Sequence, residues 1–315
     1  MRLGIVYNKN DHKLNDEAYS QTYYSMFKSL IYRFDEVEHI TEGCDVADID
    51  VDVFIFFDIH SSHHIELSGI KEHKALKLEY FNDPHQKDFK GQYRNGDKVH
   101  KLGAKNRCLR ALERGVSGVI CPYKAGYKAY FENYLGKDML WHFPISPDKS
   151  MFINNHTSIK SRVPEVLANG CTWPRELGCY DFRRWAFSRL CVKEVQHTLT
   201  NNTTPKGKDY GSFLSRFAGA LALYDWYPIP KYFEIPLAGC VTFVQWHDEM
   251  GDLGFEHGKN CIIVDKQNFE LNVEHFKHNI EDYQNIATAG RELIEDNYTS
   301  NHFADFVYTK CKESI

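Results

Sequence analysis

The chain has 315 residues, of which 43% are hydrophobic and 26% charged, and its formal net charge is -5. This composition is ordinary for a globular protein, and the length suits two domains of usual size. The acidic balance argues against strong nonspecific binding to nucleic acid. No apolar stretch reaches the roughly 18–20 residues that a membrane-spanning helix needs, so we expect no transmembrane segment. Nine cysteines without a C-x-x-C pair indicate reduced thiols in a cytoplasmic protein.

Strand and helix patterns alternate through the first half of the chain. The apolar run 51–60 is typical of a central parallel strand that is covered on both faces. Over 16–34, apolar residues recur at three- and four-residue spacing, which predicts an amphipathic helix. The other elements predicted in this half are strands at 3–8, 37–40, 75–83, 118–123 and 139–144, and helices near 103–114 and 125–136.

A second alternating unit follows a proline-containing break at 144–152. Its predicted strands are 165–170, 219–226, 240–244 and 260–265, and its predicted helices are the end of 173–196, 231–239, 270–280 and 281–296. Two runs of strand–helix alternation indicate two Rossmann-like parallel sheets, hence an α/β protein.

The segment "KYFEIPLAG" (231–239) contains a carboxylate, Glu234, among apolar residues. If the segment is a helix that begins at Lys231, its first N–H groups lack intrahelical partners and attract phosphate. Glu234 then lies one turn along, where it can accept hydrogen bonds from two ribose hydroxyls. The alternative interpretation is an exposed helix glutamate that binds no ligand.

Three motifs within 228–308 carry a resemblance to a known family: "KYFEIPLAG", "DLGFEHGKN" before a strand, and the closing "GRELIEDNYTSNH". Their order resembles the C-terminal half of GT-B glycosyltransferases, closest to the CgeB-like (spore-maturation protein) branch. The first half is similar only in outline. The resemblance implies two Rossmann-like domains facing each other across a cleft. The two are an acceptor domain (1–147) and a nucleotide-sugar donor domain (148–297). A C-terminal helix (298–315) is expected to pack back on the first domain.

The same resemblance implies roles for donor-binding residues. Glu234 corresponds to the acid that binds the donor ribose, and Lys231 and Tyr232 would lie along the diphosphate. Many retaining enzymes of this fold carry a second glutamate eight positions earlier, where this chain has Trp226. Either Asp225 replaces that acid or aromatic side chains hold the sugar, which leaves the choice between retention and inversion open.

Basic residues are required because transfer from a nucleotide sugar releases a diphosphate. The segment "YDFRR" is similar to a family element and makes Arg184 a candidate donor-binding residue, and Gly170 is a plausible phosphate-facing turn. The other basic candidates are Arg175, Arg183, Arg189, Lys206 and Lys208. The alternative for these residues is a solvated helix face.

Polar side chains follow the strands of the first half. Asp58 and His60 come at the end of the central strand, and the carboxyl ends of parallel strands face the ligand in open α/β sheets. If the enzyme inverts, it needs a general base for the acceptor at this edge. Asp58 and His60 are the candidates for that catalytic base, and Asp83 and His85 are acceptor-side candidates. Two other interpretations of these residues are a metal site at the histidines of "DIHSSHH" and loop polar groups that cap helices. The resemblance implies that no metal or other cofactor is needed.

The leading hypothesis is a metal-independent glycosyltransferase that moves a sugar from a nucleotide-sugar donor. The acceptor stays open among a polysaccharide, a protein, a small molecule and a modified nucleobase in DNA, and the acidic net charge disfavours DNA. One alternative is a non-catalytic interaction protein of the same fold. The presence of Trp226 where many of these enzymes have an acid favours this alternative. A sugar-nucleotide epimerase of the same architecture is the other.

Overall fold

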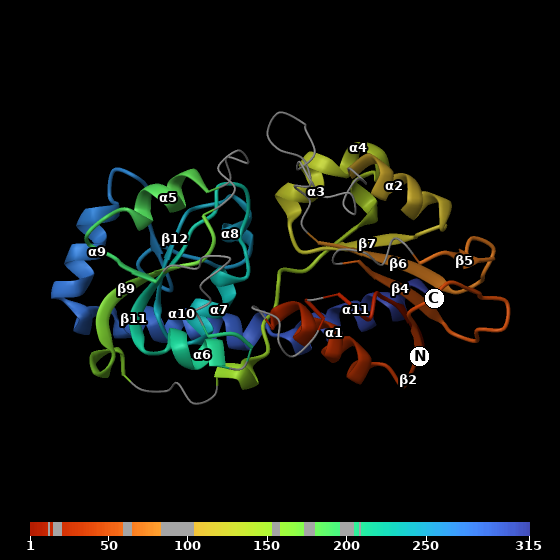
Figure 1. Ribbon diagram of the computed structural model, residues 1–315, viewed down its shortest axis with the longest axis horizontal. Coiled ribbons are helices and arrows are strands. Elements are labelled where there is room, and N and C mark those ends of the chain that lie inside the picture. The colour runs from red at the N-terminus through yellow and green to blue at the C-terminus, as the bar shows by residue number, and fades with distance from the viewer. Residues whose placement is uncertain are drawn as a thin grey trace. The chain divides into compact units, whose positions relative to one another are not determined.

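The computed structural model describes residues 1–11, 13–14, 21–58, 65–82, 104–152, 158–172, 180–195, 205–207 and 209–315. Within these ranges the side chains of Asp58 and Ala104 are not described. The chain forms two compact units (Figure 1). Unit 1 comprises Met1–Asn15, Tyr23–Pro144 and Asn301–Ile315, and unit 2 comprises Asp16–Thr22 and Ile145–Ser300.

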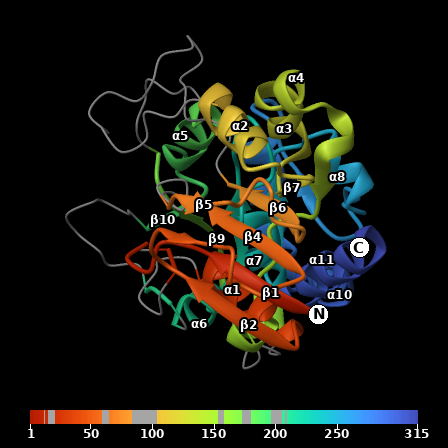
Figure 2. The same ribbon diagram turned by 90° about the vertical axis from the view of Figure 1, so that its right-hand side faces the viewer.

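Unit 1 is built on a six-stranded parallel sheet in the order β2-β1-β4-β6-β7-β8. Figure 2 shows β2, β1, β4, β6 and β7 side by side. The strands are β1 (Arg2–Val6), β2 (Glu36–Ile40), β4 (Val53–Asp58), β6 (Leu76–Phe81), β7 (Gly118–Cys121) and β8 (Leu140–His142), and a small second sheet pairs β3 (Cys44–Asp45) with β5 (Leu67–Ser68). The helices are α1 (Thr22–Arg33), α2 (Ala104–Glu113), α3 (Lys124–Tyr130), α4 (Glu132–Leu135) and α11 (Ser300–Ser314), with a short 3-10 turn at Lys137–Met139.

Aromatic packing joins α1 and α11 to one face of this sheet. Phe57 of β4 stacks on Tyr80 of β6 with ring centroids 4.5 Å apart, and Phe27 of α1 packs edge-on against Phe57. Phe303 of α11 contacts Tyr80, so the C-terminal helix completes the core of unit 1. Helices α2 and α3 lie on the opposite side of the sheet from α11 (Figure 1).

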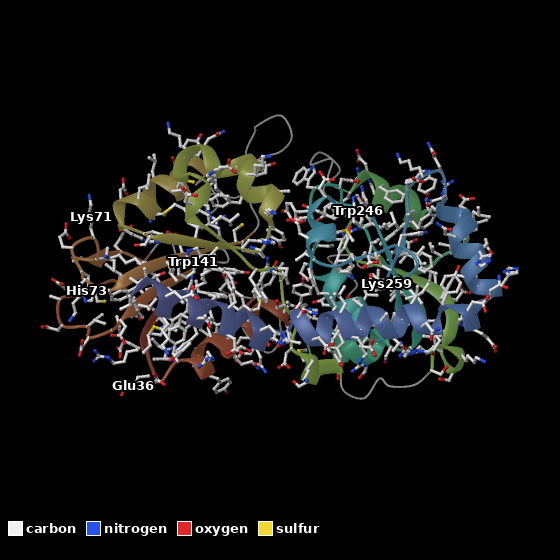
Figure 3. The ribbon with its side chains drawn as sticks, turned by 180° about the vertical axis from the view of Figure 1, so that it is seen from behind. Glu36, Lys71, His73, Trp141, Trp246 and Lys259 are labelled. Atoms are coloured by element: carbon white, nitrogen blue, oxygen red, sulfur yellow. The ribbon has the colours of Figure 1, made fainter. Side chains whose placement is uncertain are left out.

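Close packing at the sheet edge explains a glycine in β7. A Cβ atom at Gly118 would come within 2.7 Å of Nε1 of Trp141, which is labelled in Figure 3. Only glycine allows the indole of β8 to lie this close to its neighbouring strand.

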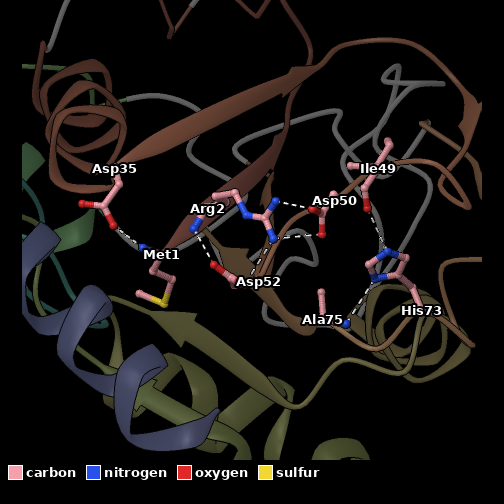
Figure 4. A network of polar contacts seen from close by, with 8 residues as sticks. All are labelled: Met1, Arg2, Asp35, Ile49, Asp50, Asp52, His73 and Ala75. Carbon is pink, nitrogen blue, oxygen red and sulfur yellow. Dashed lines mark hydrogen bonds and ion pairs between the residues drawn. The ribbon is translucent and has the colours of Figure 1, made fainter.

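A polar network surrounds the amino ends of the strands of unit 1 (Figure 4). The backbone N–H of Arg2 donates to Asp52 at 2.7 Å, and its guanidinium pairs with Asp50. His73 donates from Nε2 to the Ile49 carbonyl at 3.0 Å and accepts from the Ala75 N–H at Nδ1. These polar groups pair with one another, so internal hydrogen bonds occupy them at the amino ends of the strands.

Unit 2 is built on a five-stranded parallel sheet in the order β10-β9-β11-β12-β13. Its strands are β9 (Val163–Asn169), β10 (Lys193–Val195), β11 (Phe217–Ala222), β12 (Val241–Val244) and β13 (Ile262–Ile263). Its helices are α5 (Asp181–Phe187), α6 (Asp209–Leu214), α7 (Lys231–Leu237), α8 (Glu249–Asp252), α9 (Phe269–His278) and α10 (Gln284–Asn297), and 3-10 turns occur at Lys149–Phe152, Ile159–Ser161 and Ile280–Tyr283.

Two apolar clusters cover the two faces of the unit 2 sheet. One joins α6 and α7 to the strands, with Phe213 and Phe233 among its members, and the other joins α5 and α9, with Phe182 and Phe276. Continuous burial on both faces is the reason that β11 reads as an unbroken apolar run. The predicted fold class, an α/β protein with two Rossmann-like halves, is confirmed.

The structure corrects several predicted elements. The strand expected at 219–226 ends at Ala222, because the next residues form a turn with a polar Asp225. The helix expected at 125–136 breaks at Phe131 into α3 and α4. A helix was expected at the end of 173–196, but helix α5 lies earlier, at Asp181–Phe187, and Lys193–Val195 forms strand β10. The short elements β10, α6 and α8 have too few residues to show a period, and the sequence did not predict them.

Candidate functional site

The candidate site of unit 2 lies where its central strands end. β9 ends at Asn169 and is followed by Gly170, and β11 ends at Ala222 and is followed by Leu223. Because the strands are parallel, their carboxyl ends share one edge of the sheet, which is where open α/β sheets bind ligands. Lys231, the first residue of α7, reaches this edge.

Lys231 is a buried cation whose hydrogen-bond partners are neutral. Its side chain donates from Nζ to Oδ1 of Asn169 at 2.6 Å and to the hydroxyl of Tyr210 at 2.7 Å. All three residues are buried. Burial lowers the pKa of Lys231 to about 7, although the nearby charge of Glu234 opposes this shift. The charged form of Lys231 is therefore only partly compensated inside the protein.

Arg183 is a second buried cation at the same edge. Its guanidinium donates from Nε to the Leu223 carbonyl and from Nη1 to the Cys171 carbonyl, each at 2.7 Å. Among the described residues, no carboxylate pairs with it, and it is 4% exposed. Its positive charge contributes to the low pKa of Lys231, which indicates that the two cations are close neighbours.

Gly170 lies between these two cations. Its φ of +127° belongs to a region that side chains rarely adopt. A Cβ atom built there would come within 3.1 Å of Cε of Lys231 and 3.7 Å of Nη1 of Arg183. Glycine thus allows the backbone to pass directly beside both positive groups. Two cations beside a glycine turn can bind an anionic group such as a diphosphate.

Glu234 is buried in α7 with 3% exposure, so the alternative of an exposed helix glutamate is wrong. Its Oε1 accepts a hydrogen bond from the hydroxyl of Thr22 at 2.6 Å. Thr22 belongs to the short segment Asp16–Thr22 that is grouped with unit 2. Sequence reasoning missed this residue, since nothing in its neighbourhood links it to a carboxylate 212 positions away.

The first turn of α7 differs from the expectation of unpaired amides. The N–H of Tyr232 donates to the Ile229 carbonyl, and the N–H groups of Phe233 and Glu234 both donate to Pro230, all at 2.9 Å. These three amides are therefore engaged within the segment. The cationic side chains, rather than the helix amides, are the anion-binding groups at this edge.

The other predicted donor-binding residues have local partners. The side chain of Arg184 donates to the Thr172 carbonyl at 2.9 Å and pairs with Asp181, which is largely exposed. The hydroxyl of Tyr232 donates to the Gln245 carbonyl at 2.9 Å, and its ring is fully buried. The structure brings Arg183, not its neighbour Arg184, beside Lys231 and Gly170.

Asp225 and Trp226 lie in the turn after β11. One oxygen of Asp225 accepts from the backbone N–H of Asp181 at 2.8 Å, and the other accepts from the Gln245 side chain at 3.0 Å. Asp225 thus connects its own turn, through hydrogen bonds, with the segments that contain Asp181 and Gln245. Trp226 contacts Tyr224 edge-on, with ring centroids 5.9 Å apart. After β12, Trp246 is 40% exposed and is labelled in Figure 3.

Two polar residues mark the corresponding edge of unit 1. Asp58 is the last residue of β4 and pairs in register with Phe81 of β6. Asn82 follows at once, is fully buried, and finds no hydrogen-bond partner for its side-chain amide among the described residues. Its carbonyl accepts from the buried guanidinium of Arg107 at 2.9 Å. The predicted residues His60, Asp83 and His85 lie outside the described residues, as do Arg175 and Lys208.

Asn169 and Tyr210 are site residues that sequence reasoning also missed, and each had a weak signal. Asn169 directly precedes Gly170, and Tyr210 lies just after the basic segment at 206–208. In the described ranges, no group of three or more His, Cys, Asp or Glu side chains could hold a metal ion. No described helix is long and apolar enough to cross a membrane.

Comparison with known proteins supports a glycosyltransferase fold. Residues 183–308 match a protein family described as "Glycosyl transferase-like", and this match begins at Arg183 and includes α7. No curated protein is significantly similar to the chain in sequence.

Solved structures with low sequence identity share the architecture. HepE from Anabaena, whose structure contains UDP and glucose, is similar with a TM-score of 0.64 at 9% identity, over 99% of this chain and 100% of that one. Sucrose-phosphate synthase from Thermosynechococcus elongatus has a TM-score of 0.62 at 9% identity, over 100% of both chains. An α-glucosyltransferase in complex with UDP and a DNA containing an HMU base has a TM-score of 0.59 at 8% identity, over 99% of both. Residues 183–308 are thus a glycosyltransferase-like segment, in a chain that has the two-sheet architecture of GT-B glycosyltransferases.

Proposed function

We propose that the protein is a nucleotide-sugar-dependent glycosyltransferase whose unit 2 binds the donor. The observation that carries this proposal is the pair of buried cations, Lys231 and Arg183, that flank Gly170. Among the described residues neither cation hydrogen-bonds to a carboxylate, and burying such charges is costly unless a partner compensates them. A diphosphate would supply that partner. The family match over 183–308 includes both residues.

The proposed chemistry follows from this placement. The bond between the anomeric carbon of the sugar and the diphosphate oxygen breaks, and the diphosphate leaves with an additional negative charge. Lys231 and Arg183 stabilise this charge as it develops, and their burial strengthens the interaction. An acceptor hydroxyl forms the new bond to the anomeric carbon and loses its proton to a base, for which Asp58 and His60 remain the candidates.

Glu234 is proposed to bind the donor ribose through its hydroxyls. It lies one turn after Lys231 on α7, and a turn rises roughly 5.4 Å, which suits the distance from a nucleotide's phosphate to its ribose. Gly170 allows the backbone to approach the phosphates. Tyr232, Asp225 and Arg184 are proposed to hold the loops around the site. Their polar groups form hydrogen bonds with neighbouring loops.

Unit 1 is proposed to bind the acceptor at the carboxyl ends of β4 and β6. The buried side-chain amide of Asn82, which has no hydrogen-bond partner among the described residues, supports this assignment, because a ligand or water can complete such a group. Asp83 and His85 follow it in the chain and stay acceptor-side predictions. The CgeB-like branch remains the finer proposal for the family.

The test is calorimetric titration of UDP, GDP, ADP and dTDP into the wild-type protein and Lys231→Met. UDP comes first because the similar HepE and α-glucosyltransferase structures contain it. A charge-assisted hydrogen bond contributes roughly 1.5–3 kcal/mol, so the substitution should weaken binding by about ten- to a hundredfold.

Lys77→Met is the matched control. Lys77 is also a 7% exposed lysine, but it lies near the start of β6 and donates to the His73 carbonyl. We expect its loss to leave nucleotide affinity unchanged. If the folded wild-type protein binds none of the four nucleotides, the proposed function is wrong. If it binds one of them, mass spectrometry of the sugar nucleotides that the protein hydrolyses would identify the donor sugar.

A further inference from the structure

Thr22 makes an unusual contact for a residue at the start of a helix. Its hydroxyl donates to Oε1 of Glu234 at 2.6 Å, and the two residues are 2% and 3% exposed. The length is typical of a charge-assisted O–H···O⁻ bond. The segment Asp16–Thr22 is grouped with unit 2, whereas the stretches before and after it belong to unit 1. The contact therefore connects a distant part of the sequence to the candidate ribose-binding carboxylate.

A carboxylate that binds a ribose must be held in one orientation. A glutamate side chain has several rotatable bonds, and immobilising such a side chain on binding costs roughly 0.5–1.5 kcal/mol. The Thr22 bond already restricts Glu234 in the ligand-free protein. A carboxylate offers about four lone-pair sites, so it can accept from Thr22 and from other donors at the same time.

We propose that Thr22 is a positioning residue for nucleotide binding: its hydroxyl orients the Glu234 carboxylate toward the ribose hydroxyls of the donor. This inference rests on the proposed function, because it takes Glu234 as the ribose-binding residue. Thr22 itself does not touch the reacting atoms. Its contribution is to restrict the carboxylate before the nucleotide arrives.

The experiment is titration of UDP and 2′,3′-dideoxy-UDP into the wild-type protein, Thr22→Val and Thr22→Ser. Valine keeps the shape of threonine but removes the hydroxyl, and we expect UDP to bind roughly three- to tenfold more weakly. Serine keeps the hydroxyl and should retain wild-type affinity. For dideoxy-UDP, which lacks the ribose hydroxyls, wild type and Thr22→Val should bind equally.

Thr242→Val is the matched control. Thr242 of β12 is 1% exposed, and its hydroxyl has no hydrogen-bond partner among the described residues. The same chemical change there should leave UDP affinity as it is in the wild type. Thermal melting of each variant checks that it is folded, and Thr22→Ala provides a second hydroxyl-free variant if Thr22→Val does not fold.

The outcomes separate the inference from the function on which it rests. Equal or tighter UDP binding by Thr22→Val would overturn the inference, and tighter binding would show that the Thr22 hydroxyl competes with the ribose. An equal loss for UDP and dideoxy-UDP would also overturn it, because the effect would not involve the ribose. If the wild-type protein binds UDP but the Thr22 variants do not show the expected changes in affinity, the inference about Thr22 is wrong and the proposed function stands. If the wild type binds none of UDP, GDP, ADP and dTDP, both proposals are wrong.

Discussion

Arg114 in unit 1 and Lys231 in unit 2 are both buried cations, but their partners differ. Arg114 donates from Nη1 to Glu79 at 3.1 Å, and these two residues are 5% and 1% exposed. Its guanidinium also lies over the ring of Phe56, with the carbon Cζ 4.0 Å from the ring centroid. Lys231 instead donates to an amide oxygen and a phenol hydroxyl.

This difference separates a structural charge from one that is available to a ligand. The carboxylate of Glu79 compensates the positive charge of Arg114 inside the protein. Lys231 and Arg183 have no such compensation at hydrogen-bonding distance among the described residues. Burial alone therefore does not identify a site, and the charge of the partner decides the role.

The largest effect is expected when the structural pair is broken. Arg114→Met would leave the Glu79 carboxylate buried without its cation, which costs roughly 3–5 kcal/mol of unfolding free energy. Denaturant unfolding measures this loss. The double variant Arg114→Met, Glu79→Leu should recover most of it, because both charges are then gone. A single variant as stable as the wild type would show that the pair contributes little.

The next effect concerns pH and Lys231. Its pKa is lowered from 10.5 to about 7 on folding, so between these values the unfolded chain binds more protons than the native protein. The unfolding free energy should therefore rise with pH over this window, by up to about 1.4 kcal/mol per pH unit. Lys231→Met should lack this rise, and urea unfolding at several pH values compares the two proteins.

Nucleotide binding should show the opposite trend. A bound diphosphate stabilises the charged lysine, so UDP affinity should fall as the pH rises above about 7, by up to about tenfold per unit. Affinity that does not change between pH 6.5 and 9 would place the diphosphate away from Lys231. Lys231→Met provides the reference, since it has no proton to lose at this position.

A smaller effect distinguishes two buried asparagines. Asn169 accepts from Lys231, so Asn169→Leu should destabilise the protein by roughly 1–3 kcal/mol. Asn82 has no side-chain partner among the described residues, so Asn82→Leu should be neutral or stabilising. Thermal unfolding measures both, and a large loss for Asn82→Leu would show that its amide has a structural role.

The smallest effect is expected at Arg184. Its partner Asp181 is 63% exposed, and an exposed ion pair contributes at most about 1 kcal/mol. Arg184→Met should change UDP affinity less than twofold, whereas Arg183→Met should weaken binding by about tenfold or more. The two variants differ by one position in α5, so each serves as the control of the other. If Arg184→Met weakens UDP binding more than Arg183→Met does, Arg184 is the donor-binding residue.

Much of the fold was readable from the sequence, for particular reasons. The apolar run at 51–60 predicted a buried central strand, and β4 (Val53–Asp58) lies within it. Helix α7 was predicted at its observed position because Pro230 precedes it and Gly239 follows it. The end of β11 was predicted four residues too late, since "LYDW" continues the apolar pattern after the strand has ended.

The sequence by itself determined the two-sheet α/β class and directed attention to Lys231, Glu234 and Gly170. It did so because hydrophobic periodicity and glycine placement are local properties of the chain. Only the tertiary structure decided that Arg183, rather than Arg184, lies beside Gly170, and that Thr22 bonds to Glu234. Both facts depend on which side of a short helix faces inward and on contacts between distant segments, which no local pattern encodes.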